Sequence, residues 1–211
     1  MRTAIGFSIL LAAIFTAYAQ NPTASLNCAT NPPDWGAMSY READEASSKE
    51  ANLICIGWKN ICPEYITNLV SQLRDGRLDN DRKVLAVWLL GELWLFSKVQ
   101  PSDTMSIEVL IEYVDLRATK FDPNMRVARW GDYPAQEALK YKVRKRAANP
   151  VLQKLAGETN DLRRYLMCDV LRSKLVLGQA AALDQLKHRI HAEPDPLKRA
   201  NLQLALKQFE N

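Results

Sequence analysis

The sequence has few residues of the kinds that build catalytic and metal sites. Its 211 residues include only two histidines, and they contain no Gly-x-Ser-x-Gly, glycine-rich phosphate loop, Cys-x-x-Cys or HExxH motif. The common serine hydrolases, nucleotide-binding proteins and zinc peptidases each need one of these patterns. We therefore expect no enzyme activity and no cofactor, although a hydrolase with an unrecognised active site stays open as an alternative.

The two histidines, His188 and His191, lie three residues apart, so on a helix they share one face. Together with Glu193 or Asp195 they could hold a metal ion, but a zinc site needs three or four ligands. Histidines near the C-terminus of a helix are also favoured by its dipole. We prefer this structural interpretation and expect no metal site.

Long apolar runs are scarce, and the first of them lies at the N-terminus. It extends from Ala4 to Phe15, follows the single charge of Arg2 and precedes Ala17-Tyr18-Ala19, a small-x-small cleavage pattern. About twelve residues are too few for a membrane span, which needs about 20, whereas the pattern is typical of a signal peptide. We predict a cleaved signal peptide over residues 1–19, cut after Ala19, and a secreted or periplasmic protein without integral membrane association. A buried N-terminal helix is the alternative.

Neither sign of charge dominates the chain. Removing Arg2 from the 28 basic residues leaves 27 against 24 acidic ones, a net charge of +3 for the predicted mature chain. This small excess is unlike that of an obligate nucleic-acid binder. We therefore do not expect a nucleic acid as the partner.

Alternating apolar and polar residues are almost absent, so we expect no sheet. Apolar residues instead recur at helical spacing from about Ser39, and Asp81, Asn149 and Asp195 stand where N-caps are expected. We expect an extended segment over residues 20–38 and one all-α domain over residues 39–211. The pattern predicts about nine helices, in residues 40–56, 63–76, 81–98, 105–116, 134–146, 150–157, 161–176, 179–190 and 196–209.

Four cysteines follow the predicted cleavage point, at positions 28, 55, 62 and 168. In an oxidising compartment an even number favours disulfides, and four cysteines allow three connectivities. We expect at least one disulfide among Cys28, Cys55 and Cys62, whose pairing stays open. Cys168 lies inside a helical pattern and is expected to be a small core residue.

Residues 131–146 read GDYPAQEALKYKVRKR and end in a dense group of cations, namely Lys140, Lys142, Arg144, Lys145 and Arg146. If Pro134 begins one helix, the apolar residues form its buried face, and the cations occupy its solvent-facing positions and its last turn. We favour this structural interpretation. The alternative is a basic patch for an acidic partner such as an anionic protein surface, a polysaccharide or a lipid headgroup.

Two groups of tryptophans differ in their surroundings. Trp88 and Trp94 lie in the most apolar predicted helix and are core candidates. The others lie beside turns, where they either seal the ends of the helical stack, as we favour, or act as exposed recognition anchors; these are Trp35, Trp58 and Trp130.

The predicted helix DRKVLAVWLLGELW combines a charged start with Ala86 and with Leu-Leu-Gly-Glu-Leu at 89–93. It resembles the first helix of a HEAT repeat, in which a glycine lets helices pack closely, and SIEVLIEYVDL resembles the second. The stretch from YPAQEAL to ANPVLQKLAG is similar to another unit, although Lys140 stands where the glycine would be, which marks an irregular unit. The resemblance covers roughly residues 45–210. It implies a right-handed stack of antiparallel helix pairs, a HEAT-like α-solenoid.

Folds of this kind work mainly by offering an extended surface to another macromolecule. We therefore expect an exported, non-catalytic protein-binding or scaffold module whose partner is another protein or an acidic macromolecule. An exported inhibitor or immunity-type protein that binds one enzyme is a second hypothesis, because such a protein would also need no active site.

Overall fold

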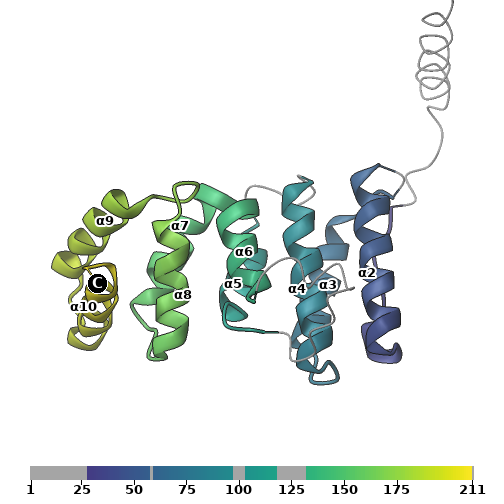
Figure 1. The fold of residues 1–211 in the computed structure, drawn as a ribbon, viewed down its shortest axis with the longest axis horizontal. Helices are drawn as coiled ribbons and strands as arrows, with labels where there is room; N and C mark the ends of the chain where they lie inside the picture. Colours follow the sequence, from purple (N-terminus) through teal and green to yellow (C-terminus); the bar gives the residue numbers. More distant parts are fainter. Residues whose placement is uncertain (1–27, 58, 97–102, 118–131, 211) are drawn as a thin grey trace, which may run out of the picture.

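The computed structural model describes residues 28–57, 59–96, 103–117 and 132–210, and these residues are mainly helical (Figure 1). The β-type pairing among them is limited to an isolated bridge between Ala29 and Ile61. The predicted all-α class is therefore confirmed. The predicted signal peptide lies outside the described residues. Within the described ranges, no helix combines the length and the apolar character that crossing a bilayer requires.

The described elements reproduce most of the predicted helix starts. The π-helix η3 (Leu139–Val143) and the 3-10 turns η1 (Trp35–Ala37) and η4 (Arg144–Ala147) supplement the α-helices. The α-helices are α2 (Tyr40–Cys55), α3 (Pro63–Arg74), α4 (Asn80–Leu95), α5 (Thr104–Glu112), α6 (Pro134–Ala138), α7 (Ala148–Leu155), α8 (Asp161–Arg172), α9 (Gln179–Ala192) and α10 (Pro196–Glu210).

Side-chain caps explain where several helices begin. The hydroxyl of Ser39 accepts the backbone N–H of Glu42, and the carboxylate of Glu42 accepts the N–H of Ser39, which forms a capping box at α2. The cap of α4 is Asp79, which accepts the N–H of Arg82, so the prediction of Asp81 as the cap was wrong by two residues. Pro63 begins α3 at a position where its missing N–H costs nothing.

The two caps predicted before prolines differ in outcome. Asp195 accepts the backbone N–H of Leu197 at 2.8 Å, so its predicted role at the start of α10 is confirmed. Asn149 was wrongly predicted as a cap, because it lies inside α7. Its Oδ1 instead accepts a hydrogen bond from Nη2 of Arg189 on α9 at 3.1 Å. That bond links α7 to α9.

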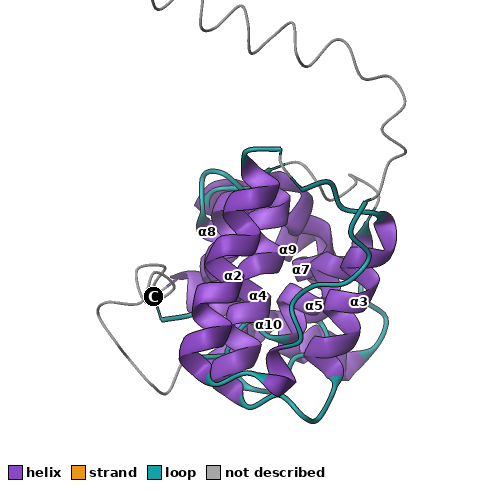
Figure 2. Ribbon diagram, turned by 90° about the vertical axis from the view of Figure 1, so that its right-hand side faces the viewer, coloured by secondary structure: helices purple, strands orange, loops and turns teal. Residues whose placement is uncertain are grey.

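The helices follow one another along the long axis, from α2 at one end to α9 and α10 at the other (Figure 1). Alternate helices contact each other: α4 lies against α2 and α6, α8 lies against α6 and α10, and α5 lies against α3 and α7. Successive helices also make contact, as in α3 with α4 and α9 with α10. In the end-on view, the helices lie behind one another around a common centre (Figure 2).

The centre of the core is α4, in which every residue from Val84 to Trp94 is buried. Trp88 and Trp94 are therefore core residues, as predicted. A Cβ placed on Gly91 would lie 2.8 Å from the Cβ of Ala138, closer than two such atoms approach each other in real structures. The close helix packing expected at Gly91 is confirmed, and it brings α6 against α4.

The segment before α2 is attached to the turn between α2 and α3. A disulfide joins Cys28 to Cys62, which confirms the predicted bridge and defines its pairing. The backbone N–H of Cys62 donates to the carbonyl of Ala29 at 2.9 Å, and the side-chain amide of Asn68 donates to the carbonyl of Thr30 at 2.8 Å. Covalent and hydrogen bonds together fix this segment on the helical domain.

Candidate partner-binding site

The basic run does not form one amphipathic helix. α6 ends at Ala138, and the chain continues as η3 and η4 before α7 begins. The prediction of a single helix over residues 134–146 is therefore wrong in its second half. Pro150 provides a reason for the break before α7. In a continuous α-helix its nitrogen could not donate to the carbonyl of Arg146, and its ring would clash with that carbonyl.

Lys142 is an internal residue. Its side chain is 6% exposed, and its Nζ lies 2.9 Å from Oε1 of Glu92 on α4, whose side chain is 7% exposed. The prediction that Lys142 faces solvent is wrong. A buried charge requires a partner of opposite sign, and the carboxylate of Glu92 in the last turn of α4 meets that requirement. Lys142 therefore joins η3 to α4 and is removed from the candidate binding patch.

Lys140 also faces a neighbouring helix. Its Nζ lies 2.9 Å from Oδ2 of Asp169 on α8 and 3.7 Å from Oε1 of Glu137. Burial raises the pKa of Glu137, although Lys140 opposes the shift. Burial disfavours the charged form of Lys140, but the contacts with Asp169 and Glu137 outweigh it, and the pKa of the lysine is raised. Lys140 thus joins η3 to α8.

The remaining three cations of the run are exposed, and we call them the cationic turn: Arg144, Lys145 and Arg146. None of them forms an ion pair with a carboxylate in the described ranges. The guanidinium of Arg146 lies 5.5 Å from the ring centroid of Trp94, within the range of a cation–π contact. The cationic turn is therefore the part of the basic run that an acidic partner can reach.

The backbone of the cationic turn is strained at its first residue. Arg144 has a φ of 59°, which makes it the single non-glycine residue with positive φ in the described part of the chain. Its Nε donates to the carbonyl of Tyr141 at 2.9 Å, which holds the side chain against η3. Such backbone geometry costs about 1–3 kcal/mol and is concentrated at functional sites. This strain distinguishes the cationic turn from the ordinary connections of the fold.

Of the three tryptophans predicted as alternative anchors, Trp35 lies among the described residues, and there it is not an exposed anchor. Trp35 is fully buried, and its Nε1 donates to the hydroxyl of Ser47 on α2 at 2.8 Å. The structure therefore contradicts an anchor role for Trp35. Trp58 and Trp130 lie outside the described residues. Tyr141 and Tyr165, which we did not select from the sequence, are 44% and 51% exposed.

Cysteine and histidine chemistry is not assembled into a reactive centre. Cys55 is exposed and Cys168 is buried, and both are outside the disulfide. Burial raises the pKa of Cys168 to about 12, so the thiol stays protonated near neutral pH and is a core residue, as predicted. His188 and His191 are exposed on α9. Among the described residues, no group of three or more His, Cys, Asp or Glu side chains is placed to hold a metal ion.

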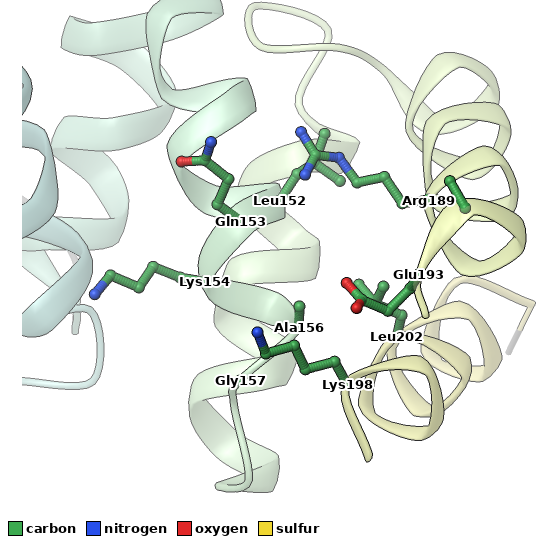
Figure 3. Close-up of a pocket in the computed structure, with 10 residues that line it drawn as sticks. Leu152, Gln153, Lys154, Ala156, Gly157, Arg189, Glu193, Lys198 and Leu202 are labelled. Atoms are coloured by element: carbon green, nitrogen blue, oxygen red, sulfur yellow. The ribbon is translucent and has the colours of Figure 1, made fainter. Parts of the chain in front are cut away.

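A cleft of about 400 Å³ lies between α7 and the pair formed by α9 and α10 (Figure 3). Arg189, Glu193 and Lys198 border it with charged groups, and its apolar lining residues are Leu152, Ala156, Ala192 and Leu202. Lys154 belongs to the same wall, but its side chain points away from the other charged groups (Figure 3). The sequence did not reveal this cleft, because its residues come from separate helices and no motif connects them.

Comparisons with protein-family models, with curated proteins and with solved structures found no match for this chain. Its function must therefore be argued from its own side chains and their arrangement.

Proposed function

We propose that this protein is an exported, non-catalytic binding module for another protein, built as a HEAT-like α-solenoid of antiparallel helix pairs. The observation that carries the proposal is the order of helix contacts. α4 contacts α2 and α6, α8 contacts α6 and α10, and α5 contacts α3 and α7. Contacts between alternate helices are what two parallel rows of stacked hairpins produce, and such stacks present long surfaces to a partner.

The distribution of charges supports binding at the surface over chemistry in the interior. The buried cation Lys142 is paired with Glu92. Arg163 on α8 pairs with Asp115, which follows α5, at 2.6 Å and with Glu158, which precedes α8, at 2.9 Å. These ion pairs join helices to one another. The cations of the cationic turn, by contrast, face solvent and are available to an acidic surface of a partner.

Two features support export. The N-terminal pattern predicts a signal peptide, and the Cys28–Cys62 disulfide is of the kind that persists in oxidising compartments. Because the disulfide attaches Cys28 to Cys62 at the start of α3, it belongs to the scaffold.

Affinity capture with the immobilised mature chain tests the proposal. The bait is incubated with the extracellular or periplasmic fraction of the source, and captured proteins are identified by mass spectrometry. A matched variant, Lys145→Glu/Arg146→Glu, should retain its melting temperature and capture less of the partner. The control variant, Lys49→Glu/Lys174→Glu, reverses two exposed lysines elsewhere and should capture as much as the unmodified chain.

Each result has a distinct consequence. Capture of one or more proteins that depends on the cationic turn supports the binding function. If a single enzyme is captured at one-to-one stoichiometry and its activity is blocked, the protein is an inhibitor of that enzyme. No saturable partner at any ionic strength would refute the proposal. Turnover of a hydrolase substrate that is abolished by substitution of a surface residue would replace it with an enzymatic function.

A further inference from the structure

We infer that the cleft between α7 and the α9–α10 pair is a docking site for an acidic peptide segment of the partner. The peptide places an apolar side chain in the cleft, and the acidic residues of the peptide lie on either side of that side chain. This inference rests on the proposed binding function and adds the place of binding and the chemistry of the ligand.

The first argument is the charge of this end of the molecule. From Arg144 to the C-terminus the chain has 13 lysine and arginine residues against 7 aspartate and glutamate residues, a net charge of +6. The whole chain has a net charge of only +4, so the residues before Arg144 are acidic on balance. An acidic ligand is therefore attracted to the half of the molecule that contains the cleft.

The second argument is the position of two cations at the cleft. Arg189 and Lys198 come from α9 and α10, and both side chains extend toward α7 (Figure 3). Neither forms an ion pair with a carboxylate among the described residues. The Nη2 of Arg189 donates to Asn149 at 3.1 Å, which holds the guanidinium in place and leaves its other N–H groups for a ligand. A guanidinium held in this way is suited to a carboxylate.

The third argument is the apolar surface between these charges. Leu152 of α7, Ala156 directly after α7 and Leu202 of α10 line the cleft. A ligand that carried charge alone would leave this surface in contact with water. A peptide that places a leucine- or phenylalanine-sized side chain between two acidic residues would cover the apolar lining and meet both cations. A cleft of about 400 Å³ has room for such a side chain and adjacent backbone.

Glu193 distinguishes a peptide from a simple anion. Its carboxylate lies at the cleft between Arg189 and Lys198 (Figure 3), and Oε1 accepts the backbone N–H of Asp195 at 3.1 Å. A sulfate ion has no hydrogen-bond donor to offer this carboxylate. A peptide offers backbone N–H groups, which the second carboxylate oxygen can accept. The arrangement of two cations around one acceptor therefore favours a peptide.

The test uses a phage-displayed library of random dodecapeptides selected on the mature chain, with counter-selection on Arg189→Glu/Lys198→Glu. We expect the enriched peptides to share an apolar residue flanked by aspartate or glutamate. The most enriched peptide is then synthesised with a fluorescent label, and the dissociation constant of its complex with the protein is measured by fluorescence anisotropy. Enrichment of basic peptides, or of none, would overturn the inference.

The variants define the expected magnitudes. A surface ion pair changes affinity by up to about fivefold, so reversal of both cations should weaken binding by more than about tenfold. The control Lys174→Glu/Lys187→Glu reverses exposed lysines outside the cleft and should change it less than about twofold. Ala192→Trp should block the cleft and abolish binding without changing the charge. If inorganic phosphate at millimolar concentration displaced the peptide completely, the cleft would be a simple anion site and the inference would be wrong.

Failure of this inference can be separated from failure of the proposed function. If proteins captured from the extracellular fraction bind Ala192→Trp as well as they bind the unmodified chain, the cleft is not the docking site, while the binding function stands. If the unmodified chain captures no partner, the proposed function fails, whatever the peptide selection shows.

Discussion

Replacement of Lys142 with methionine should destabilise the protein by about 3–5 kcal/mol. The cost arises from the partner that is left behind. Glu92 is 7% exposed and would lose the ammonium group that lies 2.9 Å from its Oε1. Two unit charges at that separation attract by roughly 6 kcal/mol at an effective dielectric constant of about 20, before the cost of removing them from water. Methionine retains most of the apolar stem, so the change removes the charge with little loss of packing.

Urea and thermal unfolding of the protein measure this change. For a domain of this size the melting temperature falls by about 2–4 °C per kcal/mol, so a decrease of about 10 °C is expected. The matched control is Lys145→Met, the same substitution at an exposed lysine of the same run, which should change stability by less than about 0.5 kcal/mol.

The two results together decide the placement of Lys142. An equally small effect of both substitutions would refute its internal position and restore the interpretation as a solvent-facing cation. A further variant, Glu92→Met/Lys142→Met, removes both charges and should recover much of the stability that the single substitution loses, because replacing a buried pair by apolar side chains is often neutral. Without such recovery, the explanation by an unpaired carboxylate would fail.

Three further tests concern packing, pH response and cysteines. Gly91→Ala should lower the free energy of unfolding by about 1–3 kcal/mol, because the new Cβ would lie 2.8 Å from that of Ala138. Adding Ala138→Gly should restore the lost stability, and a lack of recovery would contradict the contact. Burial opposes ionisation of Glu158, but Arg163 and backbone N–H groups outweigh it and the pKa is lowered. The stabilisation from the Glu158–Arg163 pair should therefore be present above the ordinary glutamate pKa and lost as the pH falls through the lowered pKa of Glu158. Arg163→Gln should flatten that part of the stability–pH curve, and an unchanged curve would contradict the assignment. The non-reduced protein should be two hydrogen atoms lighter than its four-thiol form because of the disulfide, and a four-thiol mass would refute the bridge. Alkylation of the native protein should modify Cys55 alone.

Local sequence signals were sufficient for most helix starts. Pro63 and Pro134 begin helices as predicted, and α8 and α9 begin at the predicted residues Asp161 and Gln179. These signals work because capping side chains and the missing N–H of proline act within one turn of the residue that carries them. These signals contain no information about which helix packs against which, so they could not show which cations of the basic run are paired inside the fold and which are exposed.

The error at the basic run has a physical origin in a distant partner. Fifty residues separate Lys142 from Glu92 along the chain, so no local pattern connects them. One signal was nevertheless present. Glu92 is the single ionisable side chain among residues 84–95 of a helix that is otherwise apolar, and such a carboxylate requires a buried cation. The sequence indicates that a partner exists, but only the packing of η3 against α4 identifies it.

The contacts between helices that are near one another in the chain also bear on how this protein folds. α4, α6 and α8 each lie against helices only one or two positions away in the chain, so closing the loops between them costs less entropy than joining the two ends of the chain would. Chains with local contacts fold quickly. If the protein is exported as we propose, its first hairpins can begin to fold before the last helices have emerged from the membrane, whereas the face of α4 that contacts α6 stays uncovered until α6 follows.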